Sequence, residues 1–400
     1  MFEAFSTSLT GLNAFKEQLS TISNNVSNAE TTAYKSEGLS FSEILSGSMS
    51  ETSTGGGVSV QSITTDWTQG SLTTTGSATD LAITGSGLFA VSSESGVTYY
   101  TRDGSFNYDS DLNLVTSDGY AVQGYTIDDD GDLGSIGDIS LSSVQSIAAS
   151  ATTEISTTLN LNSDTDTSET YSTTVSVYDS LGNEIPITLT FTKSDTNEWD
   201  WSAGISSSYG TVTGSGALTF DSSGALEAGT SPTITLNLTN GATASQAITW
   251  SLYNSGGDTN NTLTQYASAS STSSTSQDGH ATGTLESTSI DNNGVITGSY
   301  SNGEKKELFR IALAGFTNCD GLRKTGDNLY SETAASGSAT ISAAGSDQAG
   351  YLTSGSLELS NVDMAAEMSS AIIAQRAYES CAKMITVENE ILQVTVNMLK

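Results

Sequence analysis

The chain has 400 residues, of which 45 are acidic and 12 are basic, so its formal net charge is -33. This length predicts two or more domains, and the negative charge argues against nucleic acid and anionic membranes as partners. Glycine is abundant, proline is scarce, and serine and threonine occur throughout, a mixture that favours short strands and tight turns over helices.

The amino-terminal segment has apolar residues in steps of three or four, at Phe5, Leu9, Leu12, Phe15, Leu19, Ile22 and Val26. This spacing predicts one amphipathic helix of about seven turns. The first five residues have neither a basic start nor a cleavable apolar core, so no secretory signal peptide is expected. No apolar run approaches the roughly 20 residues that cross a bilayer, so no membrane insertion is expected.

A polar segment over residues 21–37 follows this seam. It contains three closely spaced asparagines and ends with Tyr34, Lys35, Ser36 and Glu37. Asparagine and threonine side chains can satisfy backbone groups outside regular structure. We expect this segment to end the helix and lead the chain outward, as a joint.

The middle of the chain has the pattern of short β-strands separated by turns. Alternating or β-branched runs precede Gly, Asn-Gly or Asp-Gly turn signals, which is typical of sandwiches and barrels. The clearest runs cover residues 81–84, 88–91, 97–102, 112–115, 175–178, 187–191, 295–300 and 308–313. The predicted fold is therefore mainly β, with α-helical termini.

Two low-complexity segments, residues 46–57 and 267–276, are expected to be flexible or loosely held. Together with the helical ends they predict a nested multidomain chain with coiled-coil-like terminal helices and sandwich-like or barrel-like β-domains. The expected parts are a terminal helical domain (1–30 and 360–400), a joint (31–70), an inner β-domain (71–145 and 277–359) and an outer β-domain inserted in it (146–276).

The carboxyl-terminal segment predicts a long helix that begins near Ser360 with a capping sequence, SNVD. One seam alternates in steps of four and three through Met364, Met368, Ala371, Gln375, Tyr378, Ala382, Ile385, Asn389, Leu392, Val396 and Leu399. A second seam runs through Ala377, Cys381, Met384, Ile391 and Met398. Two seams need neighbours on two sides. A hairpin of the two chain ends explains one seam, and we favour further copies of the chain for the other.

Residues that could carry chemistry do not form a convincing site. The acidic run Asp128 to Asp132 lacks the Gly and Glu of an EF-hand loop, because its sixth and twelfth positions are Leu133 and Ile139. His280 is the only histidine, so a His-based metal or catalytic centre has a single candidate. Two buried free thiols are favoured for Cys319 and Cys381, although a disulfide stays open. We expect no catalytic residue, no cofactor and no metal. We therefore expect that the protein is not an enzyme.

The two ends carry motifs of a known family. The stretch NNVSNAETTAYK over residues 24–35 resembles the amino-terminal signature of the bacterial flagellar rod and hook family of axial proteins. The stretches SNVD at 360–363 and AQRAY at 374–378 resemble its carboxyl-terminal signature. TDWTQG at 65–70, VYDSLGN at 177–183 and YSNG at 300–303 resemble the hook members. The motif residues are Asn24, Asn25, Asn28, Thr31, Tyr34, Lys35, Asn361, Asp363, Gln375 and Arg376.

The resemblance implies a structural protein exported through the flagellar type III apparatus without a cleaved signal. It implies polymerisation outside the cell into the hook, a curved, flexible tube that acts as a universal joint and transmits torque from rod to filament. The implied partners are copies of itself, the rod, the hook cap, the hook–filament junction proteins and the export apparatus. The terminal helices would form the inner tube, with the β-domains outside.

The apolar seams give this resemblance a mechanism, because subunit association would bury surface that a lone chain leaves exposed. We expect disordered ends in the monomer that become ordered on assembly. The expected self-assembly residues are Phe5, Leu9, Leu12, Phe15, Leu19, Ile22, Val26, Met364, Met368, Tyr378, Ile385, Leu392, Val396 and Leu399. Two alternatives are a flagellar distal rod protein and a secreted β-rich adhesin or glycan-binding protein.

Overall fold

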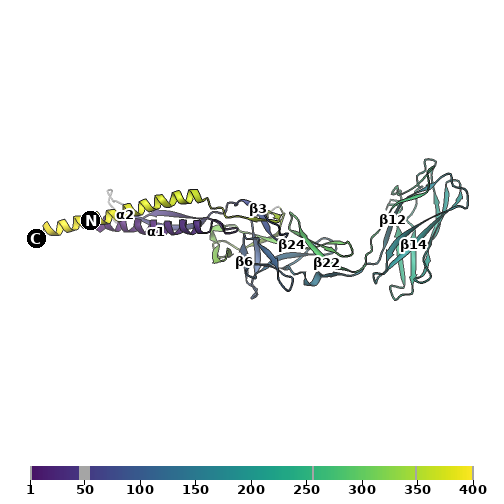
Figure 1. Cartoon of the computed structure of the whole chain (residues 1–400), viewed down its shortest axis with the longest axis horizontal. Coiled ribbons are helices and arrows are strands. Elements are labelled where there is room, and N and C mark those ends of the chain that lie inside the picture. Colours follow the sequence, from purple (N-terminus) through teal and green to yellow (C-terminus); the bar gives the residue numbers. More distant parts are fainter. Residues whose placement is uncertain (1, 45–54, 255, 347–348, 399–400) are drawn as a thin grey trace. The chain divides into compact units, whose positions relative to one another are not determined.

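The computed structural model describes residues 2–44, 55–254, 256–346 and 349–398 (Figure 1). The chain divides into two compact units. Unit 1 comprises Met1–Ser142, Thr288–Gly298 and Glu307–Lys400; unit 2 comprises Ser143–Ser287 and Ser299–Lys306. In the described part of the chain, no helix combines the length and the apolar character that a membrane crossing requires.

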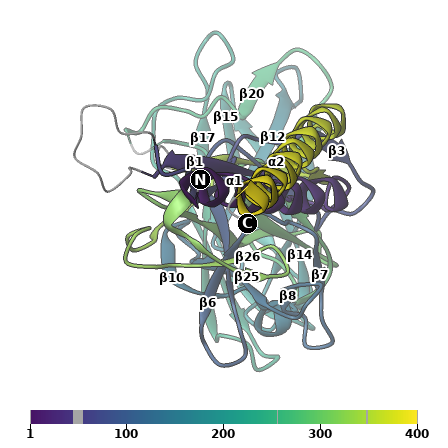
Figure 2. The same cartoon turned by 90° about the vertical axis from the view of Figure 1, so that its left-hand side faces the viewer.

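Unit 1 contains the two long helices, α1 (Phe2–Ser27) and α2 (Met364–Met398). They lie side by side and run in opposite directions (Figures 1 and 2). The predicted helices at both ends of the chain are therefore confirmed. Helix α1 ends at the predicted asparagines, where the side chain of Asn28 donates a 2.9 Å hydrogen bond to the carbonyl of Asn24. This bond satisfies one of the carbonyls left free at a helix carboxyl end.

The start of α2 corrects the predicted cap. Ser360 lies four residues before the helix, and the capping side chain is Asp363. Its Oδ1 accepts hydrogen bonds from the amides of Ala365 (2.9 Å) and Ala366 (3.1 Å). An aspartate at this position satisfies free amides and places negative charge at the positive end of the helix dipole.

The joint predicted over residues 31–70 contains a β-hairpin. Its strands are β1 (Glu37–Glu43) and β2 (Val58–Thr65), which pair antiparallel. The hairpin contacts α1, with the rings of Phe15 and Phe41 6.2 Å apart. Of the predicted flexible segment 46–57, residues 46–54 lie outside the described residues.

The β-part of unit 1 is built around a sheet in the order β24-β9-β5-β6-β26-β25. Two short ladders, β28-β4 and β29-β3, pair segments from the two ends of the chain. Its core is closed by side chains such as Phe89 and Phe106, which are fully buried and meet edge to face. The elements are β3 (Leu72–Thr74), β4 (Leu81–Thr84), β5 (Leu88–Ser92), β6 (Thr98–Thr101), β7 (Phe106–Tyr108), β8 (Leu114–Thr116), β9 (Ala121–Ile127), β10 (Leu133–Asp138), β24 (Lys305–Gly315), η2 (Cys319–Gly321), β25 (Arg323–Gly326), β26 (Leu329–Ser331), β27 (Thr340–Ala343), β28 (Tyr351–Ser354) and β29 (Ser356–Glu358).

Unit 2 has two sheets around one apolar core. One sheet has the order β16-β18-β19-β12-β20 with β21 beside β12, and the other has the order β13-β14-β15-β17. Strand β12 alternates buried Ile155, Thr157, Leu159 and Leu161 with more exposed polar residues, the pattern of a sheet with one buried face. The elements are β11 (Ser146–Ile147), β12 (Glu154–Asn162), β13 (Thr170–Tyr178), β14 (Glu184–Asp195), β15 (Glu198–Gly204), β16 (Gly210–Thr213), β17 (Ser215–Thr219), β18 (Thr233–Leu238), β19 (Ser245–Trp250), β20 (Leu263–Tyr266) and β21 (Ser271–Gln277).

Unit boundaries fall within η1 (Leu141–Val144), β22 (Gly283–Ile290), β23 (Val295–Tyr300) and β24. The flexibility expected for residues 267–276 is wrong, because most of this segment forms β21. Strand β21 pairs antiparallel with β12, from Ile155 opposite Gln277 to Asn160 opposite Ser271. Backbone pairing holds the strand, and its small hydroxyl side chains keep their contact with water.

The acidic turn predicted at Asp128 is a β-hairpin loop. The Asp128 carboxylate accepts hydrogen bonds from the amides of Asp130 (3.2 Å) and Asp132 (2.8 Å). Four further loops, which begin at Asp109, Asp179, Asp221 and Asp291, have the same pair of bonds. The fourth residue of each loop has a positive φ and is Gly in every case except Leu112. These aspartates are therefore structural parts of turns.

Candidate functional site

One face of α2 packs against α1. Ala374 is buried in this contact face, and Tyr378, Ile385 and Leu392 are half-buried. The helices approach closely at Gly11, where an added Cβ would lie 3.2 Å from Cys381 Sγ. A hairpin of the two ends thus covers one apolar side of α2, as one of the two interpretations of the sequence requires.

A second apolar face of α2 is left open. After Met384, large apolar residues recur in alternating steps of three and four, which places them along one side of the helix. This outer stripe consists of Ile373 (68% exposed), Met384 (51%), Val387 (46%), Ile391 (48%), Val394 (58%) and Met398 (82%). An exposed row of large apolar side chains marks an interaction surface.

The residues predicted for self-assembly fall into three groups. Leu9, Met364, Met368 and Val396 are exposed, as expected of residues that await a partner. Ile22 is buried within the chain, and the half-buried members are Phe5, Leu12, Phe15, Leu19, Val26, Tyr378, Ile385 and Leu392. Leu399 lies outside the described residues. Their role in assembly stays a prediction.

Sequence reasoning missed part of the outer stripe, namely Ile373, Val387 and Val394. Their spacing is a signal, since Val387 and Val394 follow Ile373 at multiples of seven. The polar residue Ser380 interrupts this series of apolar residues. The series is therefore harder to recognise than the first seam, which is more continuous.

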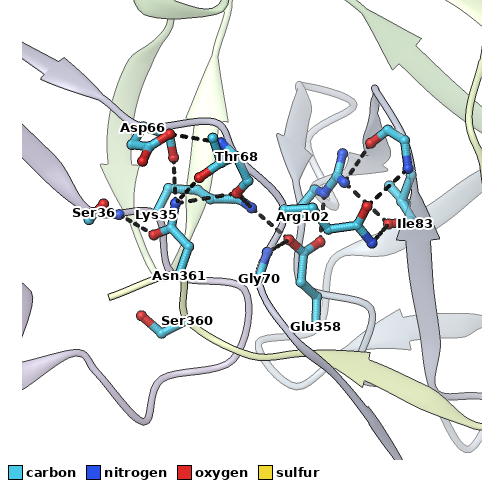
Figure 3. A network of polar contacts seen from close by, with 12 residues as sticks. Lys35, Ser36, Asp66, Thr68, Gly70, Ile83, Arg102, Glu358, Ser360 and Asn361 are labelled. Carbon is cyan, nitrogen blue, oxygen red and sulfur yellow. Dashed lines mark hydrogen bonds and ion pairs between the residues drawn. The ribbon is translucent and has the colours of Figure 1, made fainter. Parts of the chain in front are cut away.

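Three charged side chains meet at the base of the helix pair, where Lys35, Arg102 and Glu358 form what we call the basal ion cluster (Figure 3). Lys35 Nζ lies 2.6 Å from one carboxylate oxygen of Glu358, and Arg102 Nε lies 2.8 Å from the other. The side chains are 1%, 6% and 0% exposed, respectively. Lys35 follows α1, Arg102 follows β6 and Glu358 ends β29, so the cluster joins three separate segments.

The other donors of the cluster bind backbone carbonyls. The Arg102 guanidinium donates to the carbonyls of Ile83 (3.2 Å), Gly85 (2.7 Å) and Gly87 (2.5 Å). Lys35 donates to the carbonyl of Thr68 at 2.6 Å. These carbonyl dipoles offset the excess positive charge, as buried ions require.

The environment shifts the pKa values of the cluster. Burial acts to raise the pKa of Glu358, but the charge of Arg102 and hydrogen bonds from Lys35, Arg102 and Gly70 outweigh it, so the pKa is below its ordinary value. Burial lowers the pKa of Lys35, although the hydrogen bond and charge of Glu358 oppose this effect. The interaction of Glu358 with Lys35 and Arg102 is favourable while Glu358 is ionised.

Two asparagines of the family motifs connect the same segments. Asn361 accepts a hydrogen bond from the amide of Ser36 (2.8 Å) and donates to the carbonyl of Asp66 (2.9 Å) (Figure 3). Asn25 accepts from the amide of Glu37 (2.9 Å) and donates to Glu367 Oε1 (2.8 Å). Asn25 therefore ties α1 to β1 and to the first turn of α2.

The remaining motif residues have local roles or none that the contacts show. Asn24 donates to the hydroxyl of Tyr34 (3.3 Å), and Thr31 donates to Asn28 Oδ1 (3.1 Å). Burial, with the charges of Glu37 and Glu367, raises the pKa of Tyr34 to about 12, so its hydroxyl stays protonated. Gln375 and Arg376 are exposed on α2.

Arg102 and Glu358 are the residues of this site that sequence reasoning missed. Glu358 gave no sequence signal, because its apolar neighbour Leu357 points to the opposite face of the strand, and the burial of Ser356 and Glu358 is seen only in the folded chain. Arg102 is the last residue of the run 97–102 predicted as a strand, but nothing in its neighbours distinguishes it from a surface arginine.

The described residues include no group of three His, Cys, Asp or Glu side chains that could hold a metal ion. Cys319 and Cys381 are free thiols, both half-buried, so the disulfide alternative is not realised in this structure.

Comparison with known families gives matches along the chain. Residues 5–35 match the model described as flagella basal body rod protein, and residues 82–160 match the flagellar hook protein FlgE/F/G D1 domain. Residues 146–280 match the flagellar basal body protein FlaE D2 domain, and residues 353–398 match the flagellar basal body rod FlgEFG protein C-terminal model.

Similar full-length proteins are flagellar hook proteins FlgE. That of Salmonella typhimurium (strain LT2) is 36% identical over 417 residues, covering 99% of this chain and 100% of the relative. Those of Escherichia coli (strain K12) and Treponema pallidum (strain Nichols) are 34% and 31% identical, each with at least 99% of this chain and 100% of the relative covered. A crystal structure of Helicobacter pylori flagellar hook protein FlgE2 is similar in fold, with a TM-score of 0.53, 17% identity, and coverage of 70% of this chain and 98% of that one.

Proposed function

This chain belongs to the flagellar hook protein family and is a structural subunit of the flagellar hook, and we propose that its terminal helices assemble the inner wall of that tube. In this proposal, the hook is a curved, flexible tube that acts as a universal joint and transmits torque from rod to filament. The distal rod and adhesin alternatives are not favoured, because hook proteins match the chain over its full length.

The observation that carries the proposal is the outer stripe on α2. A helix that already packs against α1 on one side has a second apolar side that the described residues of its own chain leave exposed. Burying a large aliphatic side chain contributes roughly 1.5–3 kcal/mol. Completing the burial of six half-exposed side chains would therefore contribute on the order of 5 kcal/mol per subunit, before the entropic cost of association.

The helices and the β-units would have different mechanical roles in the tube. Apolar seams between helices resist sliding, since separation exposes them to water. The outward side chains of unit 2 are mainly Ser, Thr, Asn and Asp, as on β12 and β21. Polar contacts between such surfaces exchange with water at little net cost, so neighbouring outer units would slide as the hook bends.

Large apolar residues placed on the surface of unit 2 test this sliding. Such substitutions should stiffen the bending of assembled tubes. An unchanged bending stiffness across several positions would contradict the sliding mechanism.

The location of the subunit in the hook, outside the cell, sets its partners. We propose that export proceeds through the flagellar apparatus, and that the rod, the hook cap and the hook–filament junction proteins contact the ends of the polymer. Of these proposed contacts, the outer stripe directly supports the one between copies of this chain.

Electron microscopy of concentrated, purified protein is the simplest test of the proposed assembly. Curved tubes of uniform diameter are expected. Protein that stays monomeric at high concentration and in moderate salt would count against self-assembly. Straight, rigid rods would count against the role as a universal joint.

A further inference from the structure

The basal ion cluster has a placement that subunit assembly alone does not explain. It lies where the helix pair meets the β-part of unit 1, and its three members come from three segments that are far apart in sequence. Asn25 and Asn361 extend the same set of contacts to α1, β1 and the start of α2. We refer to these five residues as the basal clamp.

Three of the five clamp residues, Lys35, Arg102 and Glu358, are buried charges, and this burial affects the rigidity of the clamp. Removing one partner of a buried ion pair leaves the other charged and desolvated, which costs several kcal/mol. Small displacements are therefore opposed steeply, whereas an exposed pair exchanges its partner for water. The nearby pair Lys324–Glu37 has the same 2.6 Å separation but is 36% and 16% exposed, so it lacks this property.

The segments of the clamp also have few other ways to hold together. Residues 33–36 are connected to 358–361 by two backbone hydrogen bonds, from Ala33 to the carbonyl of Glu358 and from Asn361 to that of Tyr34. No regular ladder of the described residues joins these segments. The clamp adds two further bonds between these segments, from Lys35 to Glu358 and from the Ser36 amide to Asn361 Oδ1, and these resist twisting between the helices and the β-part.

We propose that the basal clamp is a torsional coupling: it fixes the helix pair to the β-part of unit 1, so that twist applied to the helices passes to the β-part without slack. This role assigns a function to Asn25, Lys35 and Asn361 of the family motifs. It rests on the proposed function, since a coupling matters only in a subunit that carries torque. The five side chains are positioning residues.

The test compares Lys35→Met and Asn361→Ala with Lys324→Met, a matched control that removes an exposed lysine from an ion pair of equal length. A gene that encodes each full-length variant would replace the hook gene of a motile bacterium. A strain with the gene for the wild-type chain serves as the reference. The main readout is the torsional stiffness of the hook, measured by twisting a bead attached beyond the hook while the motor is locked. Hook number and the unfolding temperature of the purified protein are measured alongside.

We expect hooks in all strains. The torsional stiffness should be at least twofold lower than that of wild type in the Lys35→Met and Asn361→Ala strains. In the Lys324→Met strain it should equal that of wild type. Unchanged stiffness in both clamp variants would overturn it. Loss of hooks together with loss of cooperative unfolding would also overturn it, because the cluster would then be only part of the fold. Absence of hooks with the wild-type chain would refute the proposed function itself, and the coupling with it.

Discussion

The carboxylate of Glu358 lies 2.6 Å from the ammonium group of Lys35, which precedes it by 323 residues, and neither side chain is more than 1% exposed. Contact over this sequence distance requires that both ends of the chain have reached the β-part of unit 1. The pair therefore reports on the folding of unit 1 as a whole.

Replacing Glu358 by Gln should destabilise unit 1 strongly. The substitution keeps the shape but leaves Lys35 and Arg102 buried without a counter-charge, a change that typically costs about 3–5 kcal/mol. The free energy of unfolding from urea titration checks this value. Lys324→Met, which removes the 36% exposed partner of Glu37, should cost clearly less than Glu358→Gln. Equal losses in the two variants would refute the role of burial.

The same residue predicts how stability depends on pH. Because the pKa of Glu358 is lowered in the folded chain, its contribution is complete above the ordinary pKa of a glutamate and is lost as the pH falls through the lower, folded value. The difference in unfolding free energy between wild type and Glu358→Gln should be constant near neutral pH and shrink in the acid range. A difference that grows on acidification would contradict the assignment.

The outer stripe predicts an assembly defect without a folding defect. Ile391→Glu places a charge on the stripe, whereas Gln393→Glu adds the same charge at an exposed residue outside it. The first variant should lose tube formation, because burying an unpaired carboxylate costs several kcal/mol, and the second should assemble nearly as wild type. Light scattering and electron microscopy measure this, with unfolding curves as a control. Normal assembly of Ile391→Glu would exclude the stripe from the interface.

Ionic strength should control assembly, since every subunit has a net charge of -33. Charges interact over about 30 Å in 0.01 M salt but only about 10 Å in 0.1 M salt. The critical concentration for tube formation should therefore rise as salt is removed. A critical concentration that does not change between these conditions would show that repulsion between subunits is neutralised in some other way.

Much of this architecture follows from local patterns in the sequence. The spacing of Phe5 to Val26 predicts α1, and runs such as residues 295–300 coincide with strands of the structure. Periodicity shows that α2 has more than one apolar side, but it does not say which side meets α1. For that reason the predicted assembly residues include Tyr378, Ile385 and Leu392, which the structure half-buries, along with residues that it leaves exposed.

The basal clamp was less accessible to sequence reasoning. Asn25, Lys35 and Asn361 stand in the motifs, but Arg102 gives no local signal, because its partner is 256 residues away. Buried ions are recognised by the segments that surround them, and those segments meet only in the folded chain. The cap of α2, in contrast, is local: the sequence predicts it within SNVD, and the structure places it at Asp363, the last residue of that motif, instead of Ser360, the first.

Hydrogen–deuterium exchange of α2, compared between dilute monomer and assembled tubes, tests the central claim most directly. We expect fast exchange of the amides of residues 364–398 in the monomer and slowing by at least a hundredfold in tubes, while the β-units are protected in both. Helix amides already protected to the same degree in the dilute monomer would show that the chain needs no copies of itself to complete these helices, and would contradict the account.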